Sequence, residues 1–316
     1  MNCPLCGQKE PQMLTDRLRN GEPLRVLYCP DCDAGYLEDR KTGDELKAYY
    51  RDAYRKEYKP DLRKQADAGR LFDIAARFQE DRIARIERYL RKEASVLDVG
   101  CSSGAFLYRI KDKVQALAGV EPDPEAARFA SRACGCPVYA GYLPETPLPK
   151  GSFDVVCSFQ VMEHVEDPLA FLLQMKEYVK DDGVLCVEVP NLRDALVSAF
   201  ELPNYRRFYF RSAHLFYFGD RGLRLLMERA GLEGDVFYSQ DYHFVNHMNW
   251  ALSDKPQPSA EDGMGEPAFP LRREADPDAG ARLNGFLRRV NREYKALLEE
   301  LGMTSKIGFI ARKKRD

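Results

Sequence analysis

The middle of the chain alternates short apolar runs with segments of helical apolar spacing. The first run, Val96–Val99, precedes the small-residue loop Gly100–Gly104, and the apolar residues Phe106, Leu107 and Ile110 follow at helical spacing. A short apolar run predicts a buried strand, and a strand, a tight turn and a helix form the opening unit of a nucleotide-binding parallel sheet. The pattern therefore predicts an α/β fold organised around this segment.

The same alternation continues along the chain. Further strands are expected at residues 117–120, 137–140, 152–158, 184–189, 236–239 and 307–312, the last of them antiparallel at or near the sheet edge. Helices are expected at residues 68–93, as one helix or two, and at 124–134, 169–179, 220–231 and 279–300. A stretch rich in Pro, Gly and acidic residues at 254–280 indicates a surface loop or a partly disordered insertion.

Two carboxylates are expected at the carboxyl edge of this sheet. Asp98 lies near the end of the first run, and Glu121 ends the next apolar run, about twenty residues further on. A carboxylate at that spacing on the neighbouring strand can accept hydrogen bonds from both ribose hydroxyls of a nucleoside. The loop lacks the G-x-G-x-x-G order, so the dinucleotide fingerprint is absent. A βαβ unit without a ligand remains the alternative.

The N-terminal segment carries two C-x-x-C pairs, Cys3 with Cys6 and Cys29 with Cys32. Each pair can turn two thiolates toward one ion, and four thiolates around Zn²⁺ leave no open coordination position. We therefore expect a structural zinc ribbon, with iron in a rubredoxin-like site and a chance arrangement as alternatives. The chain has nine cysteines, and their distribution favours a metal site in a reducing compartment over disulfides.

Composition excludes several classes of protein. The 316 residues, 44% hydrophobic and 31% charged, suffice for one large core and a small module. A net charge of −2 gives no general attraction to nucleic acid or to an anionic membrane. No basic-then-apolar leader and no apolar run of membrane-spanning length are visible. We therefore expect a cytoplasmic protein without a membrane partner.

The segments VLDVGCSSG and GVEPDPEAARFA, and further along FDVV with EHVEDP, resemble motifs of the class I S-adenosylmethionine-dependent methyltransferases. The resemblance implies a Rossmann-like, seven-stranded, mostly parallel sheet with helices on both faces, beside the small N-terminal zinc ribbon. The sequence departs from the family at Ser102, where the family has glycine. It departs again at Tyr142, where an acidic residue often binds the adenine amino group; the tyrosine could stack on adenine, or the backbone could make that contact.

The same resemblance assigns the residues that would bind S-adenosyl-L-methionine. Glu121 fits the ribose clamp, and Asp98 fits a carboxylate near the amino-acid end of the donor. The remaining assignments are to the glycine loop, the adenine pocket and the contacts beside the methionine portion: Gly100, Cys101, Gly104, Tyr142, Gln160 and Val161.

Methyl transfer from a sulfonium requires donor and acceptor in line, exclusion of water and, for a hydroxyl or carbon acid, removal of a proton. His164 is the first candidate base, because the intrinsic pKa of imidazole lies near neutrality. Its alternative is a structural histidine that is hydrogen-bonded to the backbone. His214 is the second candidate, and its alternative is a capping or packing role in an aromatic segment.

The expected domain boundaries place a zinc ribbon at residues 1–42 and a helical connector or lid at 43–93. The methyltransferase domain follows at 94–316, with an aromatic acceptor segment at 191–253 and an insertion at 254–300. The connector carries a run of tyrosines that either pack it against the main domain or close over the cofactor or acceptor: Tyr49, Tyr50, Tyr54 and Tyr58.

The ribbon, the tyrosine-rich connector and the class I motifs together resemble bacterial methyltransferases of sugar and polysaccharide pathways. The resemblance implies a small acceptor, either a sugar or a nucleotide-linked sugar or glycan precursor, methylated on oxygen, nitrogen or carbon. The alternative is an rRNA or tRNA methyltransferase whose ribbon grips RNA. The ribbon mixes Arg17, Arg19 and Arg25 with acidic residues, so a nucleic-acid partner is disfavoured. A third hypothesis is a non-catalytic binding module that has kept the fold.

Overall fold

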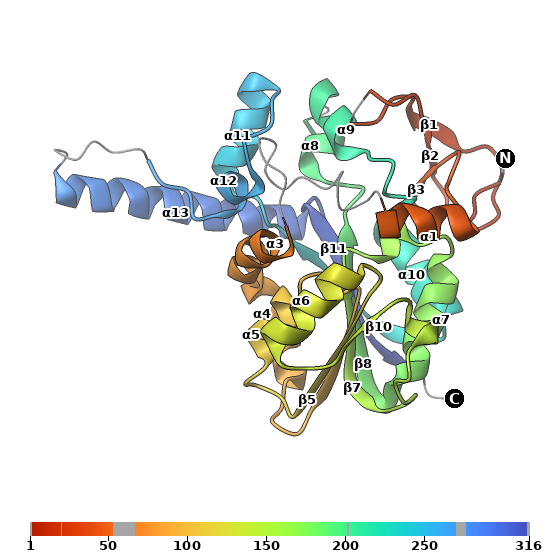
Figure 1. The fold of residues 1–316 in the computed structure, drawn as a ribbon. Coiled ribbons are helices and arrows are strands. Elements are labelled where there is room, and N and C mark those ends of the chain that lie inside the picture. Colours follow the sequence, from red (N-terminus) through yellow and green to blue (C-terminus); the bar gives the residue numbers. More distant parts are fainter. Residues whose placement is uncertain (1, 20, 53–66, 201, 270–275, 315–316) are drawn as a thin grey trace.

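The computed structural model describes residues 2–19, 21–52, 67–200, 202–269 and 276–314 (Figure 1). Its centre is a seven-stranded sheet in the order β10-β11-β8-β7-β4-β5-β6. The strands are β4 (Ser95–Val99), β5 (Ala116–Glu121), β6 (Val138–Ala140), β7 (Phe153–Phe159), β8 (Val179–Pro190), β10 (Leu232–Ser239) and β11 (Lys306–Lys313). The expected Rossmann-like fold class is thereby confirmed.

The strands from β8 to β6 pair in parallel, and β11 pairs antiparallel with both β8 and β10. The last expected strand is therefore antiparallel, and it lies one position inside the edge. The registers fix the neighbours at the functional edge of the sheet. Asp98 lies beside Gly119 of β5 and beside Cys157 of β7, so its side chain starts from the middle of the parallel part.

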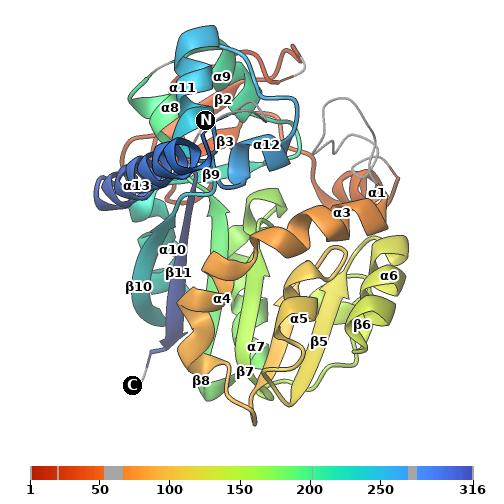
Figure 2. The ribbon, with the colours of Figure 1, turned by 90° about the vertical axis from the view of Figure 1, so that its left-hand side faces the viewer.

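Helices cover both faces of this sheet (Figure 2). One face carries α4 (Glu80–Ile86), α5 (Ala105–Ile110) and α6 (Pro124–Cys134), which follow α3 (Ala68–Ala75). The opposite face carries α7 (Pro168–Tyr178) and α10 (Asp220–Arg229). Buried aliphatic residues alternate along the strands between these two layers, so that Val96 packs with the first layer and Leu97 with the second.

Local sequence explains where these helices begin. Asp123 caps α6 by accepting from the N–H groups of Glu125 and Ala126, and Asp167 caps α7 in the same way. A proline at the first position of each helix needs no hydrogen-bond acceptor for its nitrogen. The cap expected at Asp167, with Pro168 in the first turn, is confirmed.

The N-terminal cysteines belong to a second sheet, of four strands in the order β1-β2-β3-β9. Its first three strands are β1 (Gln12–Thr15), β2 (Val26–Cys29) and β3 (Ala34–Leu37). The fourth, β9 (Phe216–Phe218), comes from the aromatic segment far along the chain and pairs with β3. The ribbon therefore shares a sheet, and the buried core around Tyr36, with the segment that follows β8.

Helices α1 (Gly43–Asp52), α8 (Ala195–Ser198), α9 (Pro203–Tyr209), α11 (Phe244–Ser253) and α12 (Ala260–Met264) lie beyond the carboxyl edge of the large sheet (Figures 1 and 2). The segment between residues 254 and 280 was expected to be a loop, but Ser259 caps α12 within it. The long α13 (Pro277–Glu300) follows. No helix in the described ranges combines the length and the apolar character that a bilayer crossing needs. Tyr54 and Tyr58 fall outside the described residues.

Candidate active site

A cavity of about 710 Å³ lies at the carboxyl ends of β4, β5 and β7. Small-molecule sites typically have volumes between roughly 300 and 1,000 Å³, so this one has room for a ligand of nucleoside size and a second small molecule. Apart from Gly104, the residues assigned to the donor and to catalysis all line it: Asp98, Gly100, Cys101, Glu121, Tyr142, Gln160, Val161, His164 and His214.

The loop between β4 and α5 lies too close to its neighbours to carry larger side chains. Gly100 has φ +79°, and a Cβ there would lie 2.4 Å from Cγ2 of Val161. Gly104 has φ +80°, and a Cβ there would lie 2.8 Å from Sγ of Cys134 in α6. Gly104 therefore allows α5 and α6 to pack closely and does not reach the cavity. Ser102 also has a positive φ, 50°, which explains why glycine suits this position.

Glu121 joins the two loops that border the cavity. Its Oε2 accepts from the N–H of Ser102 at 2.8 Å, and its Oε1 accepts from the N–H of Asp123 at 3.0 Å. Each carboxylate oxygen has two lone pairs and can accept more than one hydrogen bond. The predicted ribose clamp thus also positions the loop beneath it, and Glu121 is only 9% exposed.

Asp98 is a buried carboxyl in the cavity wall. Only 3% of its surface is exposed, and the Sγ of Cys157 lies 3.8 Å from its Oδ1. Burial raises the pKa of Asp98 to about 7, although the guanidinium of Arg82 opposes this shift. A cationic group brought into the cavity beside Asp98 would favour its charged form.

Gln160 and Tyr142 occupy other parts of the wall. The N–H of Gln160 donates to the carbonyl of Glu188 at 2.7 Å, which fixes the turn after β7, where Gln160 has φ +60°. The N–H of Tyr142 donates to Oε2 of Glu145 at 3.2 Å. The ring of Tyr142 lines the cavity, with Nζ of Lys47 from α1 at 5.7 Å from its centroid.

His164 is held by its Nδ1 atom. That nitrogen lies 2.8 Å from the carbonyl oxygen of Ala213 and 2.7 Å from the hydroxyl of Tyr50 in α1. A carbonyl oxygen only accepts, so Nδ1 carries the proton in this arrangement. Burial lowers the pKa of His164 to about 4, which keeps the ring neutral. The backbone hydrogen bond expected of a structural histidine is therefore present, and the role of His164 as base stays a prediction.

Two buried groups adjoin His164. The ring of His214 stands perpendicular to it with the centroids 4.7 Å apart, and burial lowers the pKa of His214 well below its usual value. Glu163 is 1% exposed, and burial raises the pKa of this carboxyl to about 8. Sequence reasoning treated Glu163 only as part of a motif, although its position directly before His164 and shortly after the expected strand was a signal; both residues lie in the short 3-10 helix η4 (Met162–His164).

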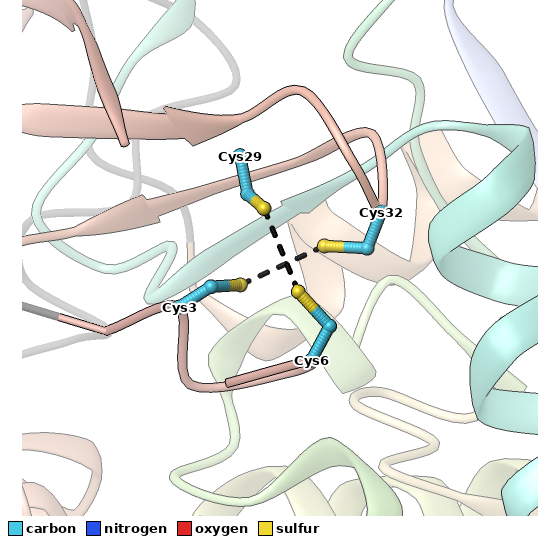
Figure 3. Close-up of side chains that lie close together, drawn as sticks. All are labelled: Cys3, Cys6, Cys29 and Cys32. Carbon is cyan, nitrogen blue, oxygen red and sulfur yellow. Dashed lines mark hydrogen bonds between the residues drawn. The ribbon is translucent and has the colours of Figure 1, made fainter. Parts of the chain in front are cut away.

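The four N-terminal cysteines form one cluster (Figure 3). None of the four lines the cavity. The Sγ atoms of Cys3 and Cys32 are 3.6 Å apart, as are those of Cys6 and Cys29, and all four lie within 4.8 Å of one another. Thiolates about 2.3 Å from a tetrahedral Zn²⁺ have sulfur–sulfur separations of roughly 3.8 Å. The residues present thus fit the predicted zinc site, and none of the four cysteines is in a disulfide.

A family model described as a methyltransferase domain matches residues 71–235, which is just over half of the chain and contains most of the cavity wall described above. The chain belongs to this methyltransferase family. The match begins in α3 and ends in β10, so it includes the whole parallel part of the sheet.

Individual relatives of this methyltransferase share shorter segments. An uncharacterized methyltransferase of Schizosaccharomyces pombe is 30% identical over 124 residues, 35% of this chain and 45% of that protein. A tRNA U34 carboxymethyltransferase of Aeromonas hydrophila is 33% identical over 151 residues, 43% of each chain. The matches thus span less than half of these curated relatives. The solved structure of a SAM-dependent methyltransferase from Archaeoglobus fulgidus is 17% identical, with a TM-score of 0.49 over 75% of this chain and 94% of that one.

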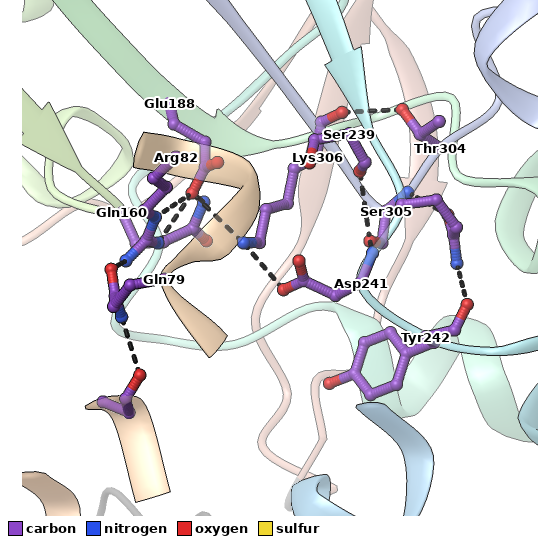
Figure 4. A network of polar contacts seen from close by, with 12 residues as sticks. Gln79, Arg82, Gln160, Glu188, Ser239, Asp241, Tyr242, Thr304, Ser305 and Lys306 are labelled. Atoms are coloured by element: carbon purple, nitrogen blue, oxygen red, sulfur yellow. Dashed lines mark hydrogen bonds and ion pairs between the residues drawn. The ribbon is translucent and has the colours of Figure 1, made fainter. Parts of the chain in front are cut away.

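A charged network that sequence reasoning missed borders the methyltransferase cavity (Figure 4), and three of its members, Arg82, Asp241 and Lys306, line it. Oε1 of Glu188 in β8 lies 2.6 Å from Nη2 of Arg82 and 3.2 Å from Nζ of Lys306, and Lys306 lies 2.7 Å from Asp241. Burial alone would raise the pKa of Glu188, but Arg82 and Lys306 lower it to about 2. The available signal was Glu188 itself, a charged residue near the end of an otherwise apolar run.

Proposed function

We propose that this protein transfers a methyl group from S-adenosyl-L-methionine to a small acceptor, and that donor and acceptor bind together in the 710 Å³ cavity. The observation that carries the proposal is the placement of Glu121 and Asp98. Both carboxyls line one cavity at the carboxyl edge of a sheet whose family is that of methyltransferases. An open α/β sheet places its ligand at this edge.

The donor would supply a methyl group on a positively charged sulfur. Glu121 would accept hydrogen bonds from the ribose hydroxyls, and Asp98 would pair with the donor's ammonium group. A buried carboxyl such as Asp98 suits a cationic partner, because the partner compensates the cost of its burial. Gln160 and Val161 would contact the methionine portion, and the ring of Tyr142 would pack against adenine.

The acceptor side of the cavity favours a compact ligand that is both flat and polar. Aromatic rings from α9 and from the segment before α11 line it together with one guanidinium and one carboxyl: Tyr205, Phe208, Tyr209, Tyr242, Arg211 and Asp194. Aromatic faces pack against the apolar faces of sugar rings, and the polar groups can bind hydroxyls. We therefore propose a sugar, a nucleotide-linked sugar or another glycan precursor as acceptor.

Proton removal from the acceptor would fall to the histidines. Burial lowers the pKa values of His164 and His214, so both rings are neutral at physiological pH and able to take a proton. Because Nδ1 of His164 is bonded to Ala213, transfer to that ring would use Nε2.

RNA methylation is a second candidate, because one relative carries the name tRNA U34 carboxymethyltransferase. The ribbon gives little support to it. Nε of Arg19 donates to the carbonyl of Phe208 at 2.6 Å, its guanidinium stacks on the Phe208 ring, and Arg25 pairs with Glu38 at 2.5 Å. Two of the three ribbon arginines are therefore engaged within the protein.

We also propose a structural zinc site in the ribbon. Cys3, Cys6, Cys29 and Cys32 would hold one Zn²⁺ ion whose four positions are all filled by protein, so the ion would stabilise the ribbon without taking part in the reaction.

The deciding experiment incubates the zinc-loaded protein with methyl-labelled S-adenosylmethionine and, in separate arms, nucleotide sugars, bulk tRNA or bulk rRNA. We expect label in the nucleotide-sugar arm. Label in an RNA arm alone would establish the second candidate instead. A calorimetric titration with S-adenosylhomocysteine runs in parallel, and absence of saturable binding would refute the function altogether.

A further inference from the structure

Glu163, His164 and His214 converge on one point of the cavity wall. All three line the cavity, and each is less than a tenth exposed. One ligating atom from each lies within 4.8 Å of the others. Nε2 of His164 is 3.7 Å from Oε1 of Glu163, and the two imidazole rings are perpendicular. Two imidazoles and one carboxylate in this arrangement form a familiar set of metal ligands.

Three polar atoms of Glu163 and His214 at this point make no hydrogen bond to any described residue. Within the described part of the chain, neither carboxylate oxygen of Glu163 nor Nδ1 of His214 makes a hydrogen bond, although all three atoms are buried. A buried polar group left unpaired costs about 1–3 kcal/mol, and more if it is charged. Native proteins rarely leave several such atoms together, so the cluster indicates a ligand that pairs with all of them.

We propose that Glu163, His164 and His214 bind a divalent metal ion, separate from the zinc of the four cysteines, with its remaining coordination positions open to the cavity. A cation would accept lone pairs from the carboxylate and from both rings at once. Three protein ligands leave room for further ligands from the cavity, which is the arrangement of a catalytic site and differs from the closed cysteine site.

The surroundings of His164 support this assignment. A metal-bound histidine usually donates its other ring N–H to a carbonyl or carboxylate, which fixes the tautomer. Nδ1 of His164 meets the carbonyl of Ala213 at 2.8 Å, one residue before His214. This hydrogen bond orients Nε2 toward Glu163 and ties the two histidine positions together.

The charges around Glu163 predict that the proposed site binds its metal ion with moderate affinity. Glu188 strengthens the negative potential at Glu163, whereas Arg211 and Arg82 oppose it. The site has one carboxylate and two neutral rings, so it compensates only part of the ion's charge. We therefore expect an ion that exchanges with solution and is lost on treatment with a chelator, in contrast to the four-thiolate zinc.

The consequence for the reaction rests on the proposed function. A hydroxyl oxygen of the acceptor that coordinates the ion becomes more acidic. Its proton passes to water, the oxygen forms a bond to the methyl carbon, and the carbon–sulfur bond breaks with its electron pair going to sulfur. The products are the methyl ether, S-adenosylhomocysteine and the proton. With the ion bound, His164 and His214 act as its ligands, and water replaces the histidine base of the proposed function as the proton acceptor.

The test uses Mn²⁺. Thiolates prefer softer ions, and zinc already fills the cysteine site of the protein used, so Mn²⁺ can bind only at the proposed site of Glu163, His164 and His214. The loss of free-Mn²⁺ electron paramagnetic resonance signal is titrated for the zinc-loaded wild type, Glu163→Gln and His214→Gln. We expect one bound Mn²⁺ in the wild type and an affinity at least about tenfold lower in each variant. The matched control is Glu177→Gln, a surface residue paired with Lys150, which should bind as the wild type does.

Two further measurements show whether a variant is folded and how many zinc ions it binds. Each variant is first checked for a cooperative thermal transition, and bound zinc is counted after equilibration with excess Zn²⁺. Two zinc ions in the wild type and one in Glu163→Gln support the site. One zinc ion in both, or equal Mn²⁺ binding in both, overturns it.

Binding of S-adenosylhomocysteine to the same samples separates the two proposals. If the donor product binds but no second ion does, the metal site alone is wrong. If the ion binds and the donor product does not, the methyl-transfer function is wrong and the metal site stands.

Discussion

Glu121 accepts one hydrogen bond on each of its two carboxylate oxygens, from the N–H of Ser102 and from that of Asp123. A single side chain thus fixes the position of the β4–α5 loop relative to the start of α6. The same carboxylate is proposed to accept hydrogen bonds from the ribose hydroxyls. The position of the loop and the binding of the methyl donor therefore both depend on Glu121. Asp98 differs from Glu121, because the burial of Asp98 disfavours the charged form of its carboxyl.

Glu121→Ala should weaken S-adenosylhomocysteine binding by about a hundredfold or more. The change removes two hydrogen bonds to a charged acceptor, and each such bond is worth about 1.5–3 kcal/mol. Isothermal titration calorimetry measures the loss. Glu125→Ala, an exposed glutamate in the first turn of α6, is the control and should leave the affinity unchanged. Wild-type affinity in Glu121→Ala would contradict the ribose-clamp assignment.

Asp98→Asn should stabilise the free protein at pH 8 while abolishing donor binding. The pKa of Asp98 is about 7 in the folded state against a usual 3.8, so its contribution to stability is lost as the pH rises from about 4 to 7. The asparagine variant lacks this loss, which amounts to on the order of 4 kcal/mol at full ionisation.

Urea unfolding at pH 8 and at pH 5 measures this difference. The gain of the asparagine variant over the wild type should shrink as the pH falls. Asp112→Asn, at an exposed position, should show no pH-dependent difference. An equal gain at both pH values would mean that the carboxyl of Asp98 is not the cause.

At the scale of elements, buried charges tie the helical layer to the sheet. Arg82 comes from α4, Glu188 from β8 and Lys306 from β11, and Glu188 lies between the two cations. Glu188 is 1% exposed, so its charge is tolerated only because both partners are present. The network therefore also joins three elements that come from distant parts of the chain.

Arg82→Ala should destabilise the protein by about 3–5 kcal/mol, because it leaves Glu188 buried with one partner fewer. The double variant Arg82→Met with Glu188→Met removes both charges and should recover most of this loss. Chemical denaturation of the wild type, the single variant and the double variant provides the measurement. A single variant as stable as the wild type would show that Lys306 alone suffices for Glu188.

Sequence reasoning worked well for elements whose signal is local. The apolar runs located the strands of the large sheet to within about five residues, and Asp123 and Asp167 marked two helix starts. The largest difference is the start of β8 at Val179, a residue that was expected to end the preceding helix. It missed the Arg82–Glu188–Lys306 network, because periodicity does not say which distant charges meet. It also missed α12, a helix of only five residues, AEDGM, which is recognisable mainly by its cap at Ser259.

At the scale of the whole molecule, the ribbon and the methyltransferase part are joined by more than the chain. β3 pairs with β9, Asp33 forms an ion pair with Arg193 at 3.0 Å, and Arg229 of α10 donates to the carbonyl of Leu5. The sequence indicated the two C-x-x-C pairs of the ribbon clearly. It gave no sign that Phe216–Phe218 would complete their sheet, because a three-residue apolar run does not identify its partner strand.

Removal of the zinc ion that we propose at the four cysteines should therefore lower the unfolding temperature of the whole protein in one transition. Metal-free cysteines no longer hold the ribbon, and its loss exposes β9 and the core around Tyr36. Differential scanning calorimetry of zinc-loaded and zinc-free protein tests this. A separate small transition, with the main one unmoved, would show that the ribbon unfolds independently.

The position of β11 has a consequence for the order of folding. It comes last of the seven strands along the chain, yet it lies between β8 and β10. During synthesis, β8 and β10 leave the ribosome before β11, and the edge that each will pair with β11 stays unpaired until then. For β8 this interval covers more than a hundred residues, on the order of ten seconds at ordinary ribosome speeds. Lys306 arrives only with β11, so the polypeptide cannot finish its ligand cavity before nearly all of this sequence has left the ribosome.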